Sequence, residues 1–388
     1  MKLRKICVVI GSRANYSSIK SVLSEINLSS SLELQIVLCG SAVLERYGNV
    51  AKLIEKDGFS ITASLDTLIE GETPATMSKS VGLGLIELSS LFERISPSIV
   101  LKIGDRFETM STVIASTFSN ILLAHTMGGE VTGTIDESIR HAVTKFSHLH
   151  FAASKDAAAR ILKLGERKED VHLVGCPRID LVKSMLDDTS SHEHILNQDI
   201  FQEGVGSQFD LTKPFLIVSQ HPVTTEFELS ESQMNETLDA IREIKMPVIA
   251  LWPNADAGSS GISLAMRKFR EKYKHLEIHF FKNLPINVYI LLMSKTSCLI
   301  GNSSSAIREG CFIGTPSVNV GSRQDSRERG LNVIDVPHEK NKILSAINKQ
   351  IKHGNYLSED LYGDGMAAKR IVNVLQTSNP KIQKTITY

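Results

Sequence analysis

Short apolar runs alternate with longer amphipathic stretches along most of the chain. In the first half, apolar runs predict strands at residues 5–11, 34–39, 99–103 and 122–125. Stretches with apolar side chains at helical spacing separate or follow them, at residues 15–26, 41–57, 77–96 and 107–118. Because apolarity in the strand-like runs is continuous rather than alternating, both of their faces are expected to be buried. This pattern predicts a parallel sheet covered by helices, as in a doubly wound α/β domain.

The alternation begins again after a polar interval at residues 185–213, which is the best candidate for an interdomain connection. Strand-like runs follow it at residues 215–219, 248–252, 277–281, 298–301 and 317–320. We therefore expect an α/β fold of two Rossmann-like domains with a cleft between them. The N-terminal domain is expected to cover residues 1–182 and the C-terminal domain residues 183–360.

Composition excludes several classes of protein. The chain has 388 residues, which is enough for two domains. It carries 43 Lys and Arg residues against 43 Asp and Glu residues, so no net charge directs it to nucleic acid or to an anionic membrane. One Trp and seven Tyr residues are few for a surface that stacks nucleic-acid bases.

Targeting and metal-binding signals are also missing from the sequence. The five cysteines form no Cys-x-x-Cys pair, so we expect neither a zinc site nor a disulfide framework. The apolar run at residues 6–10 is too short for a signal peptide. No run approaches the ~18 apolar residues of a membrane span. We expect a cytoplasmic protein that binds no metal.

The most informative segment is residues 104–141, where charged side chains follow predicted strands. Its charged and titratable side chains are Asp105, Arg106, Glu108, His125, Glu130, Asp136, Glu137, Arg140 and His141. Charges at the ends of buried strands are costly unless they are paired or used, so we interpret this segment as an active site lining a cleft. Asp136 and Arg140 lie four residues apart on a predicted helix, where an exposed ion pair is the simpler explanation.

Residues 11–17, GSRANYS, turn from the first predicted strand into a helix and carry a basic and a hydroxyl side chain. Phosphate binding at the helix N-terminus, with Arg13 and Ser17, is one interpretation. Helix capping alone explains a serine here but not Arg13. The segment lacks both the dinucleotide-binding glycine pattern and the Gly-Lys-Ser/Thr ending of a P-loop.

The second half has a serine-rich loop between a predicted strand and a helix. Ser303, Ser304 and Ser305 offer backbone and hydroxyl donors to an anion. Glu309, one turn later, is positioned to accept two ribose hydroxyls. The alternative is an ordinary serine-rich helix cap followed by a solvated glutamate.

Three more polar positions follow predicted strands of the second half: His221, Asn254 and Arg323. Ligands of open parallel sheets bind outside the carboxyl ends of the strands. Together with the serine-rich loop, these residues predict a pocket for a nucleoside diphosphate. A histidine next to a proline, as at His221, is also common in purely structural positions.

The ordered motifs resemble a known family. GDRFE, HTMGGEVTGTIDESIRHAVTK, GCPRID, QHPVTT, PNADAG, IGNSSSAIRE and GTPSVNVGSRQ resemble those of the hydrolysing UDP-N-acetylglucosamine 2-epimerases of sialic acid biosynthesis. The resemblance runs from about residue 5 to residue 371. It implies a GT-B-type fold, a homo-oligomer (dimer or tetramer) and no nicotinamide cofactor. It also implies that a C-terminal helix near residues 363–376 packs back on the first domain, which makes residues 361–388 a third segment. We expect its polar end, residues 379–388, to be frayed.

The resemblance implies a reaction and roles for individual residues. UDP leaves from C1 as a base removes the C2 proton, and water adds to the resulting 2-acetamidoglucal to give N-acetylmannosamine. Asp105 and Asp136 match acid–base or sugar-contacting positions, and Arg106 and Arg140 match residues that position charge around them. The resemblance implies that the departing UDP is stabilised by Arg13, Ser17, Ser304, Arg323 and His221. Glu309 would hold the ribose, and Asn254 would orient the nucleotide or the sugar.

Two residues depart from the family pattern. Met127 stands where many relatives carry a catalytic Glu, and a thioether cannot transfer a proton. Either Glu130 or Asp136 performs that proton transfer, or the activity is low, or the sugar substrate differs. Asn15 replaces an acidic residue in the first loop, close to the expected phosphates or sugar.

Four alternatives to the hydrolysing reaction on UDP-N-acetylglucosamine remain open. The substrate can be a UDP-2,4-diacetamido-trideoxyhexose, as in legionaminic acid pathways, or the product can stay linked to UDP. The chain can also be an inactive homologue that binds a nucleotide sugar. A GT-B glycosyltransferase explains the Asp105 and Asp136 cluster less well.

Overall fold

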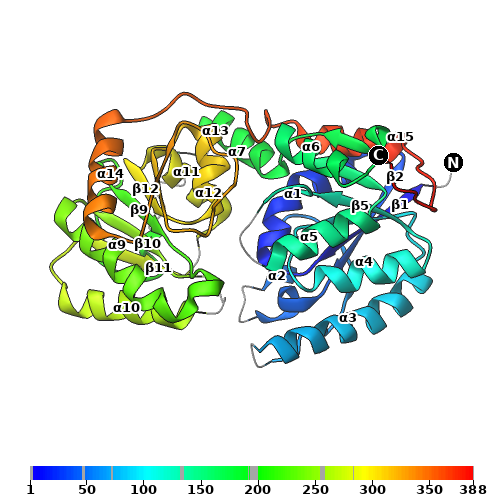
Figure 1. Cartoon of the computed structure of the whole chain (residues 1–388), viewed down its shortest axis with the longest axis horizontal. Helices are drawn as coiled ribbons and strands as arrows, with labels where there is room; N and C mark the ends of the chain where they lie inside the picture. The colour runs from blue at the N-terminus through cyan, green and yellow to red at the C-terminus, as the bar shows by residue number, and fades with distance from the viewer. Residues whose placement is uncertain are drawn as a thin grey trace. The chain divides into compact units, whose positions relative to one another are not determined.

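The computed structural model describes residues 3–45, 49–70, 73–131, 135–190, 192, 200–253, 258–282 and 284–387. The chain divides into two compact units, each built around its own sheet (Figure 1). Unit 1 comprises Met1–Val131, Ile135–Leu181 and Tyr362–Tyr388, and unit 2 consists mainly of Val182–Leu361. Among the described residues, no helix combines the length and the apolar character that crossing a membrane requires.

Unit 1 contains a parallel sheet with the strand order β3-β2-β1-β4-β5-β6-β7. Its strands are β1 (Arg4–Ile10), β2 (Leu32–Leu38), β3 (Ile61–Ser64), β4 (Ile99–Ile103), β5 (Leu122–Thr126), β6 (Leu149–Ala152) and β7 (Val171–Leu173). The central strands β1, β4 and β5 are buried over almost their whole length, as their continuous apolar sequences predict.

The helices of unit 1 are α1 (Arg13–Leu28), α2 (Val50–Lys56), α3 (Pro74–Ile95), α4 (Thr109–Phe118), α5 (Ile135–Phe146), α6 (Lys155–Lys163) and α15 (Ala367–Thr377), with 3-10 turns η1 (Gly40–Val43) and η3 (Lys168–Asp170). Apolar side chains of α1, α2 and α15 form one core with the sheet, and those of α3, α4 and α5 form a second core. Asp180 of α7 (Pro177–Asp187) accepts hydrogen bonds from the backbone N–H groups of Ala367 and Ala368, at 2.9 and 2.7 Å. These bonds cap the first turn of α15 and hold it on unit 1.

Unit 2 contains a second sheet with the order β14-β13-β12-β9-β10-β11-β8, parallel except at the edge strand β8. Its strands are β8 (Val205–Gly206), β9 (Leu216–Ser219), β10 (Val248–Leu251), β11 (Ile278–Phe281), β12 (Cys298–Gly301), β13 (Ser317–Val320) and β14 (Val333–Val336). Its helices are α9 (Ser230–Ile244), α10 (Ser259–Lys272), α11 (Ile286–Lys295), α12 (Ser304–Ile307), α13 (Glu309–Ile313) and α14 (Lys340–His353), with 3-10 turns η4 (Ile200–Gln202) and η5 (Thr224–Leu229). Helices α9, α10 and α14 pack on one face of the sheet, and α11 and α12 on the other.

Both sheets have a topological switch point, where successive crossovers leave in opposite directions. In unit 1 it lies between β1 and β4, and in unit 2 between β9 and β12. At such a point the loops after the two strands diverge and leave a crevice that binds ligands in open α/β folds. The architecture is an α/β fold of GT-B type, as the sequence predicts.

Two expectations were wrong. In the described part of residues 41–57, the predicted single helix is replaced by the 3-10 turn η1 and the short helix α2, which begins after Asn49 because that residue has left-handed backbone angles and caps α2 through its side chain. The terminal residues 379–387 are not frayed, because hydrogen bonds from Lys384 and Thr387 attach them to unit 1. The five cysteines are all free and buried.

Candidate active site

The loops after β1 and β4 meet at the switch point of unit 1. Asn15, in the first turn of α1, accepts a hydrogen bond from the Gly11 N–H at 3.2 Å. Gly104 follows β4 with φ of +78°, and a Cβ added there would lie 3.2 Å from the Asn15 side-chain nitrogen. The Asn15 amide thus bonds within its own loop and lies close to the start of the loop after β4. Arg13 and Ser17, from the same turn of α1, are partly exposed.

Asp105 and Arg140 form an ion pair between the loop after β4 and helix α5. The Arg140 side chain is only 2% exposed, whereas that of Asp105 is 27% exposed. Arg140 also donates through Nη1 to the backbone carbonyl of Glu130, at 2.7 Å. One buried guanidinium therefore fixes both the Asp105 carboxylate and the loop after β5, and leaves Asp105 accessible to a ligand.

The Arg140–Asp105 pair joins two segments and was not predicted from the sequence, where an ion pair with Asp136 was the simpler explanation. Asp136 lies in the first turn of α5, partly exposed, one helical turn from Arg140 on the same side of the helix. Glu130 is 5% exposed. The fold thus gathers Asp105, Glu130, Asp136 and Arg140 from three different segments.

Arg106 pairs with a different carboxylate, that of Glu108. Its Nε donates to Glu108 Oε1 at 3.0 Å, and the Glu108 side chain is 9% exposed. The same carboxylate packs against the first loop, because a Cβ at Gly11 would lie 2.9 Å from Glu108 Cγ. Glu108 belongs to the charged segment predicted as an active site, but the sequence assigned it no role of its own.

His125 lies beneath this group in β5, fully buried. Its Nε2 is 3.3 Å from the Gly104 carbonyl oxygen. Burial, together with the neighbouring His150, lowers the pKa of His125 to about 3, so the ring is neutral at physiological pH. A neutral ring that donates to the Gly104 carbonyl supports the loop that carries Asp105. Because the ring is uncharged, it does not compete with Arg140 for the Asp105 carboxylate.

Met127 begins the loop after β5. Thr126 pairs with Ile103, so Met127 lies at the same end of the sheet as Gly104. Its φ is +63°, and its N–H donates to the Phe151 carbonyl at 3.1 Å. The side chain packs against the apolar core of unit 1. A thioether accepts hydrogen bonds only weakly and carries no proton, so it contributes packing here.

In unit 2 the ends of β9 and β12 approach each other closely. Gly301 has φ of +128°, and a Cβ there would lie 2.2 Å from the Ser219 carbonyl oxygen, so only glycine fits. The next residue, Asn302, is fully buried and brackets the His221 backbone. Its Oδ1 accepts from the His221 N–H at 2.7 Å, and its Nδ2 donates to the His221 carbonyl at 2.9 Å.

Arg323 joins the same cluster from the loop after β13. Its Nη1 donates to the Asn302 carbonyl at 3.1 Å, and the Gln324 side chain donates to that carbonyl at 2.9 Å. Asn302 therefore ties together the loops after β9, β12 and β13. Asn302 was not among the predicted site residues, although it directly follows the strand glycine in IGNSSS.

The serine-rich loop contains a chain of hydroxyl groups. Ser303 and Ser305 are joined by a 2.8 Å hydrogen bond between their hydroxyls, and Ser305 makes a second one, of 2.8 Å, with Tyr289 of α11. Ser303 caps α12 and Ser304 is its first residue. Glu309, at the start of α13, is 2% exposed. The alternative of a solvated glutamate is therefore wrong.

Burial and the positive charge of Arg323 lower the pKa of His221 to about 3. The imidazole is consequently neutral at physiological pH, and it can donate a hydrogen bond to an anion without adding charge. The positive charge of the unit 2 cluster then comes from Arg323. Asn254, the remaining predicted residue, lies outside the described residues.

In the ranges that the structure describes, no group of three or more His, Cys, Asp or Glu side chains is arranged to hold a metal ion. The unit 1 cluster consists mainly of carboxylates and guanidinium groups, and the unit 2 cluster of hydroxyls, a guanidinium group and backbone donors. Such groups suit proton transfer and anion binding.

Comparison with known proteins places the chain in a family. The family described as UDP-N-acetylglucosamine 2-epimerase matches residues 24–376. A UDP-N,N'-diacetylbacillosamine 2-epimerase (hydrolyzing) from Legionella pneumophila is 32% identical over 375 residues, which cover 97% of this chain and 96% of the relative. A UDP-N-acetylglucosamine 2-epimerase from Neisseria meningitidis is 28% identical over 388 residues, which cover 98% of each chain.

Solved structures agree in fold. The crystal structure of a UDP-GlcNAc 2-epimerase from Neisseria meningitidis bound to UDP-GlcNAc has a TM-score of 0.79 at 17% identity, covering 96% of this chain and all of that one. The motif order, the two switch-point clusters and these matches lead to one conclusion: the chain belongs to the UDP-N-acetylglucosamine 2-epimerase family.

Proposed function

We propose that the protein is a hydrolysing 2-epimerase of a UDP-linked 2-acetamido sugar, with UDP-N-acetylglucosamine as the first candidate substrate. The products are UDP and the free 2-epimeric sugar, here N-acetylmannosamine. The observation that carries the proposal is the accessible Asp105 carboxylate held by buried Arg140. A protein that only binds a nucleotide sugar, without catalysing a reaction, has no need of a carboxylate cluster built from three segments.

The proposed reaction has two steps. A carboxylate removes the proton from C2, the C1–O bond breaks, and UDP leaves with the bonding electron pair to give a 2-acetamidoglucal. Water then adds across the double bond, with its hydroxyl on C1 and a proton on C2 from the face opposite to the one that lost it. We assign proton transfer and sugar contact to Asp105, Asp136 and Glu130, because they lie around Arg140.

UDP departure needs groups that stabilise the growing charge on the diphosphate. We assign this role to unit 2, through Arg323, the neutral His221 and the Ser303–Ser305 hydroxyls, with Glu309 on the ribose. Arg13, Ser17 and Arg106 of unit 1 are assigned to the same charge or to the sugar, and Arg140 to positioning. Asn254 is kept as a nucleotide or sugar contact, and Asn15 as a loop-positioning residue that also faces the ligand.

The second candidate substrate is a UDP-2,4-diacetamido-trideoxyhexose. The Legionella pneumophila relative, a hydrolysing epimerase of UDP-N,N'-diacetylbacillosamine, supports it, whereas the Neisseria meningitidis relative supports UDP-N-acetylglucosamine. Both sugars carry the 2-acetamido group and the C2 proton that the reaction uses. They differ at C4 and C6, so the contacts to those carbons decide between them.

The test is turnover of each UDP-sugar followed by NMR in D₂O. We expect UDP and a free 2-epimerised sugar that carries deuterium at C2, from one of the two substrates in preference to the other. A product that is still linked to UDP would instead identify a non-hydrolysing epimerase. Binding of UDP without any product from either sugar would identify an inactive homologue and reject the proposal.

A further inference from the structure

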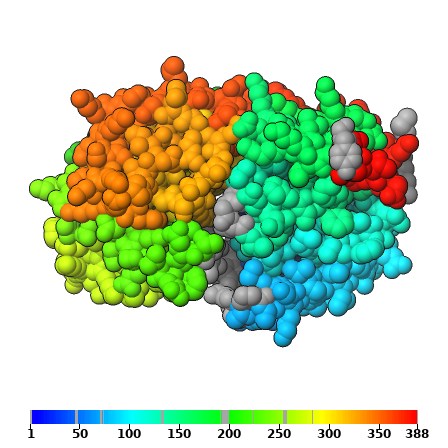
Figure 2. Space-filling view, viewed as in Figure 1, coloured from blue at the N-terminus to red at the C-terminus, as the bar shows by residue number. Residues whose placement is uncertain are grey.

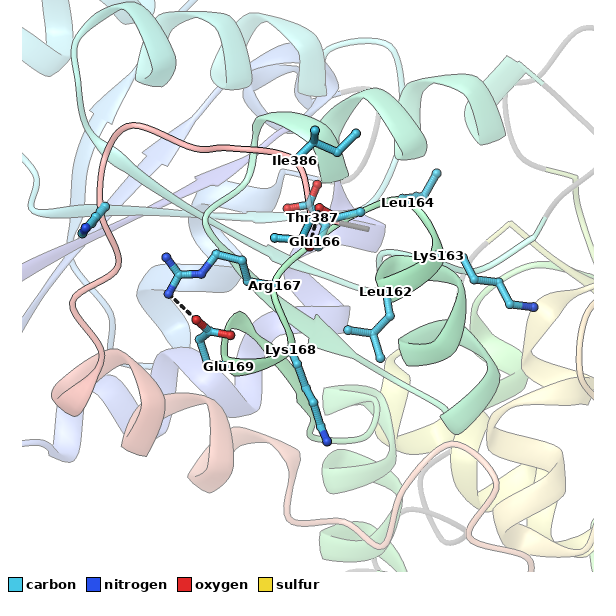
Figure 3. Close-up of a pocket in the computed structure, with 11 residues that line it drawn as sticks. Leu162, Lys163, Leu164, Glu166, Arg167, Lys168, Glu169, Ile386 and Thr387 are labelled. Carbon is cyan, nitrogen blue, oxygen red and sulfur yellow. Dashed lines mark hydrogen bonds and ion pairs between the residues drawn. The ribbon is translucent and has the colours of Figure 1, made fainter.

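The terminal segment of the chain, residues 378–387, lies along the loop that follows α6, where Figure 3 shows Ile386 and Thr387 beside Leu164 and Glu166. In Figure 2 the end of the chain is seen as red atoms on the right of the view. Thr387 donates to the Gly165 carbonyl through its N–H at 3.0 Å and its hydroxyl at 3.1 Å. Gly165 has φ of +82°, and a Cβ there would lie 2.6 Å from Ile386, so the close approach depends on glycine. His148 adds a 2.9 Å contact between its Nε2 and the Ile382 carbonyl.

Lys384 is the residue of this segment that reaches helix α5. Its Nζ donates to the carbonyls of Lys145 at 2.9 Å and Thr144 at 3.4 Å, and also to that of Ser147. The last carbonyls of a helix have no partners within the helix and carry its negative dipole end. A single ammonium group therefore satisfies the C-terminal end of α5 in both hydrogen bonding and charge.

Glu166 fixes the position of that ammonium group. Its side chain is 3% exposed and lies 2.6 Å from Lys384 Nζ, 2.6 Å from Lys145 Nζ and 3.1 Å from His150 Nε2. Burial alone would raise the pKa of Glu166, but hydrogen bonds from His150, Lys145 and Lys384 lower it to about 2. The carboxylate is thus charged at physiological pH and holds Lys384 against α5.

A continuous set of contacts leads from this end of α5 to the active site. Thr144, whose carbonyl Lys384 contacts, donates through its hydroxyl to the Arg140 carbonyl at 3.0 Å. A Cβ at Gly128 would lie 3.2 Å from the Thr144 hydroxyl and 3.0 Å from His125 Nδ1, so helix, strand and loop are in close contact. One turn before Thr144, Arg140 holds Asp105.

We propose that Lys384 is a positioning residue for the reaction: by anchoring the C-terminal end of α5 to Glu166 it sets the position of Arg140, and hence of Asp105. The inference rests on the proposed function and deepens it. Lys384 and Arg140 are 244 positions apart in the sequence. Neither the resemblance nor the motif series points to the terminal segment as part of the site.

The test compares three variants of the full chain. Lys384→Met removes the charge and keeps the apolar stem, and Lys384→Arg keeps the charge. Lys381→Met is the matched control, because Lys381 lies three positions earlier in the same segment and is exposed. Each variant is measured for kcat and KM with the turned-over UDP-sugar, for UDP affinity by calorimetry, and for amide hydrogen exchange by mass spectrometry.

We expect Lys384→Met to lower kcat about tenfold, because small displacements of catalytic groups are costly, while KM and UDP affinity stay at wild-type values. Amides of α5 should exchange faster, and those of β1 should not. Lys384→Arg should lie between wild type and Lys384→Met in both kcat and exchange, and Lys381→Met should match wild type.

Two results would overturn the inference: a wild-type kcat in Lys384→Met, or faster exchange in β1 to the same extent as in α5, which would mean general destabilisation. Failure of the proposed function looks different. In that case the wild-type protein itself turns over no UDP-sugar, and the exchange of α5 in Lys384→Met still reports whether Lys384 anchors the helix.

Discussion

At the scale of single residues, the pairing of Asp105 with Arg140 organises the unit 1 cluster. A guanidinium that is 2% exposed needs partners, and it finds them in one carboxylate and one backbone carbonyl. Because 27% of the Asp105 side chain remains exposed, the carboxylate is accessible even though it is paired. The same residue can therefore be held in place and still meet a substrate.

Asp105→Asn should lower kcat by about 10²–10⁴-fold, because an amide cannot transfer a proton as a carboxylate does. UDP affinity should stay at the wild-type value, since Asp105 is not among the residues that we assign to UDP binding. Steady-state kinetics and UDP calorimetry measure the two effects. The control is Asp156→Asn, which removes an exposed carboxylate of α6 that pairs with Arg160. Loss of turnover and of folded protein together would show that Asp105 is structural.

Met127→Glu should raise kcat, because it returns a carboxylate to the end of β5, beside the loop that carries Asp105. Glutamate and methionine are both non-glycine residues, so the left-handed backbone at this position costs them similar strain. Met127→Gln is the control for shape without a titratable group. A Met127→Glu enzyme no faster than the Gln variant would mean that another carboxylate has taken over the role.

At the scale of elements, the loops after parallel strands form the clusters. Gly301 allows β12 to approach β9 so closely that Asn302 can bracket the His221 backbone. The cost of burying these polar groups is offset by the bonds among them. A histidine placed this way is held by its backbone, and its ring is kept neutral by burial and by Arg323.

Imidazole NMR signals should therefore show His221 neutral over the whole range above about pH 4, since its pKa is lowered to about 3. Bound UDP should raise that pKa, because a nearby anion favours the protonated ring. His221→Asn assigns the signal by its disappearance. Titration of His221 near 6.5 in the ligand-free protein would contradict the described environment.

At the scale of the whole molecule, each unit has its own cores and its own switch point, and the terminal segment returns to unit 1. The contacts of Glu166 with Lys384, Lys145 and His150 join that segment to β6 and α5. A charged group with several partners of this kind makes the stability of unit 1 depend on pH.

The pKa of Glu166 is about 2 in the folded protein, below its ordinary value of 4.5, so its contribution to stability is present above pH 4.5. That contribution should be lost as the pH falls from 4.5 toward about 2, because the unfolded chain takes up the proton first. Thermal unfolding from pH 7 to pH 2.5 measures it. Glu166→Gln should be less stable at pH 7 by about 1–3 kcal/mol and less sensitive to acid.

The control for this prediction is Glu55→Gln, which changes an exposed glutamate of α2. It should follow the wild-type dependence on pH. If Glu166→Gln and wild type lost stability in parallel between pH 5 and pH 2.5, the ion cluster would not be a source of the acid sensitivity.

Much of the fold was predictable because its signals are local. Continuous apolar runs predicted β1, β4, β5, β9 and β12, and polar residues just after them predicted which loops carry the chemistry. Helix limits were harder: residues 41–57 read as one helix, but left-handed Asn49 begins a new and shorter one. Backbone angles of that kind leave little trace in the hydrophobic pattern.

The order of motifs along the chain determined the family, the α/β class and the candidate residues, because each depends on neighbours close in sequence. Only the tertiary structure decided that Arg140 pairs with Asp105, that Asn302 joins three loops, and that Lys384 contacts the last carbonyls of helix α5. Those contacts join residues tens to hundreds of positions apart, and burial and geometry select them, so no local pattern of side chains reveals them.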